Sequence, residues 1–230
     1  MNSLYNLEIM IRKVLVAEDL DSIQIGVMRT LGDAFTFDME HAKYCDQAFL
    51  KIRKALMEDN SFDLLITDLS FPKDHVKTEI HSGEQLVAMV KGLQPGIKTI
   101  IYSIEDRPFK IREYLDYLEV DGYVLKGRSS SGELVEAVQT VADNGRYISP
   151  ALAYALKNLP PLEVDDYDLE LIRELGNGNS QQEIAVLFDK RGLSPSSLSS
   201  IEKRINKLKE YFMARNTTHL VAIAKDMGLF

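Results

Sequence analysis

The sequence has only one cysteine, Cys45, among its 230 residues. An intrachain disulfide needs two cysteines and a thiolate metal cluster needs several, so the sequence excludes both. This usage is typical of proteins in a reducing compartment.

Long apolar runs are also missing. A membrane-spanning helix needs about 20 consecutive apolar residues, and the apolar runs of this chain are much shorter. The first residues, MNSLYNLE, lack the basic and then apolar pattern of a secretory signal. The chain has no internal repeat and no low-complexity tract. We therefore expect a cytoplasmic protein without a membrane partner.

Charge is unevenly distributed. The net charge is −8, yet the segment 190–215 carries seven basic residues and only two acidic ones, Glu202 and Glu210. This segment is a local basic patch in an acidic protein.

Strand-like and helix-like patterns alternate up to about residue 145. This alternation predicts an α/β fold with a doubly wound, five-stranded parallel sheet that helices cover on both faces. The expected strands are 14–17, 35–40, 64–67, 99–102 and 123–125. The expected helices are 22–31, 46–57, 83–91, 109–118 and 131–144, the last of them capped by Ser130 or Ser131.

The pattern changes after residue 148. Pro160-Pro161 and an acidic stretch predict a linker over 149–165, with a short helix at 151–159. Beyond the linker only helical patterns occur, at 169–175, 181–188, 198–212 and 218–226. We expect three parts: a first domain at 1–148, the linker at 149–165, and a small all-α domain at 166–230.

Four of the expected strands deliver polar residues at their carboxyl ends. Glu18-Asp19, Asp68, Ser103 and Lys126 each follow a different apolar run. In an open α/β sheet these ends form one crevice, so we expect the side chains to converge. The alternative is a set of unrelated polar residues that face water, which is less plausible for four strand ends together.

This combination suits phosphoryl transfer to Asp68. The donor brings negative charge, which Mg²⁺ neutralises through oxygen ligands. We expect Glu18, Asp19, Asp68 and the backbone carbonyl of Ser70 to supply those ligands. Lys126 would pair with a phosphoryl oxygen and Ser103 would donate a hydrogen bond to another.

A phosphatase of the haloacid-dehalogenase type is the competing enzymatic interpretation. That chemistry also uses a strand-end aspartate, but it needs a second aspartate two residues later as the acid and base. This chain has Ser70 at that position, which disfavours the interpretation.

Residues 12–148 resemble the receiver domain of bacterial two-component response regulators. The resemblance implies that Asp68 is the phosphoacceptor, that Glu18 and Asp19 bind the metal, that Ser103 is the switch hydroxyl and that Tyr123 is the switch aromatic residue. The bland alternative for Tyr123 is core packing. Lys126 matches the lysine of the family, but Gly127 follows it where many members have proline.

The segment after Asp68 is longer than in most of the family. Residues 71–82 replace a much shorter loop and resemble the extended loop of the Rcs-type branch of the NarL/FixJ group. His75 and His81 lie in this loop. Two histidines in a polar loop are more often solvated than metal-bound.

The C-terminal segment, 166–230, resembles a LuxR-type helix-turn-helix domain. Ser180 and Glu183 predict a capping box that opens one helix. The next helix, 198–212, combines an apolar stripe with a basic face, which suits a helix in a DNA major groove. The residues expected to contact DNA are Ser199, Ser200, Lys203, Arg204, Lys207, Lys209, Arg215 and Asn216. On charge alone, a solvated basic face is the alternative.

Two features depart from the helix-turn-helix pattern. The turn 189–197 is roughly six residues longer than usual, and Glu202 stands where members often carry lysine.

Together these features predict a response regulator that acts as a transcription factor. A sensor histidine kinase or a small phosphodonor would phosphorylate Asp68, and this would control formation of a homodimer and binding to double-stranded DNA. Beyond catalysis of its own phosphorylation and dephosphorylation, we expect no enzymatic activity. The alternative is a receiver-controlled protein–protein adaptor whose helical domain does not bind DNA.

Overall fold

The computed structural model describes residues 11–71, 78–157 and 164–230. The chain divides into two compact units. One comprises Met1–Asp106 and Ile111–Tyr154, and the other comprises Arg107–Lys110 and Ala155–Phe230. Within the described ranges, no helix is both long enough and apolar enough to cross a membrane.

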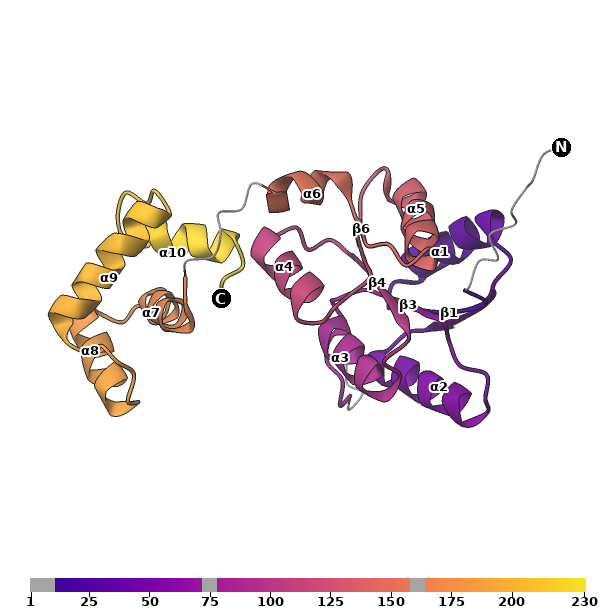
Figure 1. The fold of residues 1–230 in the computed structure, drawn as a ribbon, viewed down its shortest axis with the longest axis horizontal. Coiled ribbons are helices and arrows are strands. Elements are labelled where there is room, and N and C mark those ends of the chain that lie inside the picture. The colour runs from indigo at the N-terminus through magenta and orange to yellow at the C-terminus, as the bar shows by residue number, and fades with distance from the viewer. Residues whose placement is uncertain (1–10, 72–77, 158–163) are drawn as a thin grey trace. The chain divides into compact units, whose positions relative to one another are not determined.

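The first unit is an α/β layer structure (Figure 1). Its strands are β1 (Lys13–Ala17), β2 (Asp38–Ala42), β3 (Leu64–Thr67), β4 (Lys98–Ser103), β5 (Gly122–Leu125) and β6 (Tyr147–Ile148). Its helices are α1 (Asp21–Ala34), α2 (Cys45–Met57), α3 (Gly83–Leu93), α4 (Pro108–Asp116), α5 (Ser130–Ala142) and α6 (Pro150–Lys157). The first residues of α4 and the last residues of α6 are assigned to the second unit.

The sheet is parallel throughout, with the order β2-β1-β3-β4-β5-β6. All residues of β1 and β3 are buried, because helices cover both faces of the sheet. Helices α1 and α5 lie on one face, and α2 and α3 lie on the other (Figure 1). The predicted fold class is confirmed.

The predicted strand count is wrong. In the described residues the sheet has six strands rather than five, because the two residues of β6 pair with Gly122 and Tyr123 of β5. A two-residue strand is too short to leave a periodic pattern in the sequence.

Two local predictions also need correction. The second strand is Asp38–Ala42 and not 35–40, since Phe35 and Phe37 stack on each other at 4.7 Å before the strand begins. The residue that caps α5 is Ser129, and its side chain makes no capping hydrogen bond. The Ser130 hydroxyl instead bonds to Gly127 and Tyr102.

The second unit is entirely helical in its described residues. It contains α7 (Asp166–Gly176), α8 (Gln181–Lys190), α9 (Leu198–Tyr211) and α10 (Thr217–Asp226). Its core includes Leu171, Ile184, Phe188, Ile205 and Leu220, which come from all four helices. The predicted capping box of Ser180 and Glu183 is present at the start of α8.

Candidate functional site

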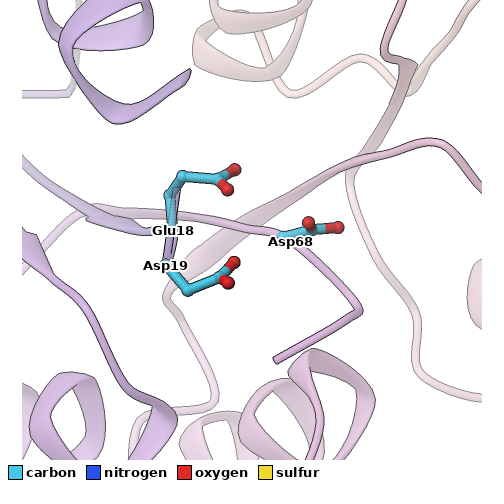
Figure 2. A group of neighbouring side chains, drawn as sticks. All are labelled: Glu18, Asp19 and Asp68. Atoms are coloured by element: carbon cyan, nitrogen blue, oxygen red, sulfur yellow. The ribbon is translucent and has the colours of Figure 1, made fainter. Parts of the chain in front are cut away.

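Three carboxylates meet at the carboxyl edge of the sheet. Glu18 and Asp19 follow β1, and Asp68 follows the neighbouring strand β3. Each contributes an oxygen, and these oxygens lie within 4.8 Å of one another (Figure 2). Glu18 is 3% exposed and Asp68 is 7% exposed. Carboxylates placed this closely with so little water repel one another unless a cation compensates them.

Lys126 supplies such a cation from the end of β5. Its Nζ lies 2.7 Å from Asp68 Oδ2 and 2.8 Å from Glu18 Oε2. Burial acts to lower the pKa of Lys126, but the hydrogen bonds to Asp68 and Glu18 outweigh it and raise the pKa above its ordinary value. Burial also raises the pKa of Glu18, while Lys126 acts in the opposite direction.

The second carboxylate oxygen of Asp68 is held by the backbone. Leu69 donates its amide hydrogen to Asp68 Oδ1 at 2.6 Å. Asp68 itself donates its amide hydrogen to the carbonyl oxygen of Ala17 at 3.0 Å. Two donors therefore fix the orientation of the Asp68 carboxylate, the Leu69 amide on Oδ1 and Lys126 Nζ on Oδ2.

Ser103 ends β4, and Tyr123 is the second residue of the adjacent strand β5. Tyr123 pairs with Ile101, two residues before Ser103, so both side chains lie on one face of the sheet. Ser103 is fully buried, and its hydroxyl accepts a hydrogen bond from the amide of Glu105 at 3.5 Å. Tyr123 is also fully buried and donates its hydroxyl hydrogen to the carbonyl oxygen of Glu105 at 2.8 Å. Its ring stacks on Tyr114 of α4. Both side chains thus hold the loop that follows β4.

Burial raises the pKa of the Tyr123 phenol above its ordinary value. The phenol therefore remains protonated and keeps its role as a donor to the Glu105 carbonyl.

The donor chemistry of this site fits Mg²⁺. The cation prefers oxygen ligands, and Glu18, Asp19 and Asp68 offer only oxygen. Ser70 lies two residues beyond Asp68 and forms an isolated antiparallel β-bridge with Ser82. Its carbonyl as a ligand stays a prediction.

The long loop after Asp68 is tied to α2. Asp46 accepts hydrogen bonds from the amides of Glu79 and Ile80, both at 2.9 Å. His81 lies 3.2 Å from the Thr78 hydroxyl through Nδ1. His75 lies outside the described residues.

In the helical unit, α9 has the amphipathic character that its sequence predicts. Ile201, Ile205 and Leu208 are buried, while Lys203 and Lys207 are exposed. A groove of about 700 Å³ runs beside the helix. Its lining includes Ser200, Lys203, Asn206 and Lys207, together with Asp165, Tyr167 and Glu210.

Arg204 differs from the other predicted DNA contacts. Its guanidinium bonds to both carboxylate oxygens of Asp168, which is 1% exposed, and to Asp165 at 2.8 Å. The structure therefore commits Arg204 to an ion-pair network inside the helical unit.

The remaining predicted contacts lie at the two ends of α9 and at the start of α10. Ser199 is exposed and Ser200 is half-buried in the first turn of α9, and Lys209 is half-buried in the last. Arg215 is exposed, and Asn216 caps α10 by accepting from the amide of His219 at 2.8 Å. DNA contact by each of these residues stays a prediction.

Sequence reasoning missed the partners of two cations. Tyr102 lies with its ring centroid 5.3 Å from Lys126 Nζ, and Asp168 binds Arg204 across 36 positions of sequence. Neither pairing has a local signal, because both join residues that are distant in sequence. The alternation of side chains along β4 gives only the face on which Tyr102 lies.

The fold and this strand-end site define a receiver-like α/β domain, which a helical domain follows in the chain. This arrangement agrees with the resemblance to response regulators that the sequence motifs indicate.

Comparisons with known proteins confirm the resemblance. No protein-family model matches the chain. The chain is similar to the response regulator GacA of Pseudomonas aeruginosa, with 28% identity over 203 residues, which are 84% of this chain and 87% of GacA. It is also similar to the transcriptional regulatory protein UhpA of Escherichia coli, with 31% identity over 117 residues, which are 51% of this chain and 56% of UhpA.

A solved structure supports the fold. RcsB of Salmonella enterica serovar Typhimurium, bound to the promoter P1flhDC in the presence of the phosphomimetic beryllofluoride, has a TM-score of 0.60 and 19% identity. The similarity covers 94% of this chain and 98% of that one.

Proposed function

We propose that this chain is a response regulator in which a phosphoryl group on Asp68 controls binding to double-stranded DNA. The convergence of Glu18, Asp19 and Asp68 within 4.8 Å carries the proposal. Lys126 completes the site from a third strand. The similarity to GacA over most of both chains supports it.

The reaction at Asp68 is a displacement at phosphorus. A carboxylate oxygen of Asp68 forms a bond to phosphorus, the bond from phosphorus to the donor breaks, and its electron pair leaves with the donor. The Leu69 amide keeps the carboxylate in a fixed orientation. Lys126, already 2.7 Å from Asp68, offers its charge to the incoming phosphoryl oxygens. A sensor histidine kinase or a small phosphodonor supplies the group.

Mg²⁺ held by Glu18, Asp19 and Asp68 would neutralise the charge that the phosphoryl group brings. Glu18 must be deprotonated for this role, and Lys126 helps to keep it so.

On the output side, the exposed lysines of α9 suit contact with DNA phosphates. Lys203 and Lys207 lie one turn apart and line the same groove as Ser200 and Asn206. Two copies of the chain on a paired half-site would double these contacts. The RcsB complex with promoter DNA supports this assignment by analogy of fold.

A binding assay with Asp68→Asn tests the proposal. Duplexes selected from a random pool by the wild-type protein with beryllofluoride and Mg²⁺ serve as the probe, and mobility shifts are compared with and without beryllofluoride. We expect beryllofluoride to strengthen binding by the wild type and to leave Asp68→Asn unchanged. The matched control is Asp59→Asn, since Asp59 is exposed and its φ of 52° suits asparagine equally.

Two results would contradict the proposal. Equal binding by all three proteins under all conditions would remove phosphoryl control. Binding that does not weaken with rising salt would remove phosphate contacts and would favour the protein–protein adaptor.

A further inference from the structure

The turn that follows Lys126 is closed by one side chain. Ser130 donates both its amide hydrogen, at 3.2 Å, and its hydroxyl hydrogen, at 2.8 Å, to the carbonyl oxygen of Gly127. Ser130 is 5% exposed. These two hydrogen bonds restrict the turn at Gly127, which has more backbone freedom than other residues.

Tyr102 extends this closure to the sheet. Its hydroxyl lies 2.8 Å from Ser130 Oγ. A hydroxyl has one hydrogen to donate, and Ser130 gives its own to Gly127. Tyr102 must therefore be the donor, and a single directed chain of hydrogen bonds runs from Tyr102 through Ser130 to Gly127.

The ring of Tyr102 contacts the ammonium group itself. Its centroid lies 5.3 Å from Lys126 Nζ, which is within the range in which a cation is attracted to an aromatic face. One tyrosine therefore touches both the charged end of Lys126 and, through Ser130, the backbone that follows it.

The position of Tyr102 separates this contact from the Ser103 and Tyr123 pair. Successive side chains of a strand point to opposite faces. Tyr102 packs with Ile100 and Val124 against the α5 side, whereas Tyr123 stacks on α4.

We propose that Tyr102 and Ser130 are positioning residues that hold Lys126 at the phosphoryl site, in the place of a proline at position 127. The inference rests on the proposed function, because it assigns a consequence to the position of Lys126. Tyr102 and Ser130 act on the metal site only through Lys126, which bonds to Glu18 and Asp68. A phosphoryl group contacts Lys126 directly, so it should depend on Tyr102 and Ser130 more strongly than Mg²⁺ does.

The test compares the full-length wild type with Tyr102→Phe and Ser130→Ala. Tyr102→Phe keeps the ring and removes only the hydroxyl group. Beryllofluoride affinity is measured by fluorine NMR at saturating Mg²⁺, and Mg²⁺ affinity alone is measured by calorimetry. The matched controls are Tyr117→Phe and Ser131→Ala, whose side chains are exposed.

We expect Tyr102→Phe and Ser130→Ala each to bind beryllofluoride about threefold to tenfold more weakly than the wild type, which is the effect of one lost hydrogen bond. We expect Mg²⁺ affinity to fall by less than beryllofluoride affinity, and both controls to match the wild type. The double variant should be no weaker than Ser130→Ala, because both changes interrupt one chain of hydrogen bonds.

Three results overturn the inference. The first is a beryllofluoride affinity that is unchanged in both variants. The second is a loss of Mg²⁺ affinity as large as the loss of beryllofluoride affinity, which indicates general disruption of the site. The third is additive losses of beryllofluoride affinity in the double variant. A wild type that binds no beryllofluoride refutes the proposed function and the inference together. A wild type that binds while the variants equal it refutes the inference alone.

Discussion

The backbone oxygen of Asp68 occupies the space that a side chain at position 83 would need. A Cβ built on Gly83 lies 1.8 Å from that oxygen and 2.8 Å from the Asp68 carbonyl carbon. The Gly83 amide also donates to the carbonyl oxygen of Leu69 at 3.0 Å. Helix α3 therefore begins in direct contact with the loop that carries the proposed acceptor, and only glycine permits this approach.

Gly83→Ala should damage the acceptor site. Because the clash is with backbone, one of the two segments must move, and we expect a loss of about 2 kcal/mol in the free energy of unfolding. Beryllofluoride binding should weaken more than tenfold. Thermal unfolding and fluorine NMR measure the two effects.

Gly92→Ala is the control for that experiment. It lies in the same helix with nothing within 4 Å of the added methyl, and alanine is the better helix former. It should leave binding unchanged and raise stability slightly. Equal behaviour of the two variants would show that the contact at Gly83 is not required.

Arg204→Met should destabilise the helical unit before it affects DNA. The change leaves Asp168, 1% exposed, without its cation, and an uncompensated buried carboxylate should cost roughly 3 kcal/mol. Hydrogen exchange of α7 and α9 amides would report the loss. The double variant with Asp168→Asn should recover part of it, since both charges are then gone. No change in exchange would place Arg204 among the residues free to bind DNA.

Lys203→Ala and Lys207→Ala should act on DNA binding alone. Each lysine is exposed on α9, so its removal should weaken binding to all sequences and lower the salt slope by about 1. Binding isotherms at several salt concentrations measure the slope. Lys225→Ala on α10 is the control and should match the wild type. A variant with an unchanged slope would exclude that lysine from phosphate contact.

Asp165→Asn gives a pH-dependent test of the same network. Burial acts to raise the pKa of Asp165, but the Asp168 amide and the Arg204 guanidinium outweigh it and lower the pKa below 3.8. A carboxyl group whose pKa is lower in the folded state stabilises the fold at pH values above its unfolded-state pKa. This contribution is lost as the pH falls through the folded-state pKa. Asparagine caps a helix about as well as aspartate, so the variant removes mainly the charge.

The wild type should therefore be more stable than Asp165→Asn near neutral pH, by about 0.5 kcal/mol for so exposed a pair. The difference should begin to fall as the pH drops towards 3.8 and should vanish once the pH is below the folded-state pKa of Asp165. Scanning calorimetry over a pH series measures it. A difference that is constant with pH would indicate lost packing and not lost charge.

The fold was largely predictable, because its signals are local. The buried runs of β1 and β3 and the capping box at Ser180 can be identified within a few residues of sequence. Strand β6 was not predictable, since two residues carry no period. The start of β2 was misplaced because Phe35 and Phe37 have the apolar alternation of a strand, although they stack on each other and pack against the core before the strand begins.

The site divides in the same way. That Glu18, Asp68 and Lys126 would converge follows from their places at the ends of parallel strands, which a doubly wound sheet brings to one edge. The surroundings of Lys126 do not follow from any pattern, because Tyr102 of β4 contacts its ammonium group and Ser130 of α5 bonds to Gly127, the residue after it. Arg204 is similar: its sequence position suits a DNA contact, which stays a prediction, and no pattern foretold its ion pairs with Asp165 and Asp168.

The sequence by itself determined which residues end at the edge of the sheet and which face of each helix is apolar, since both are consequences of backbone period. Only the tertiary structure decided which side chains pair across that edge and across the helices. Such pairings depend on distances between segments that are far apart in the chain. A buried charge pairs with the opposite charge that the packing of these segments places nearest to it.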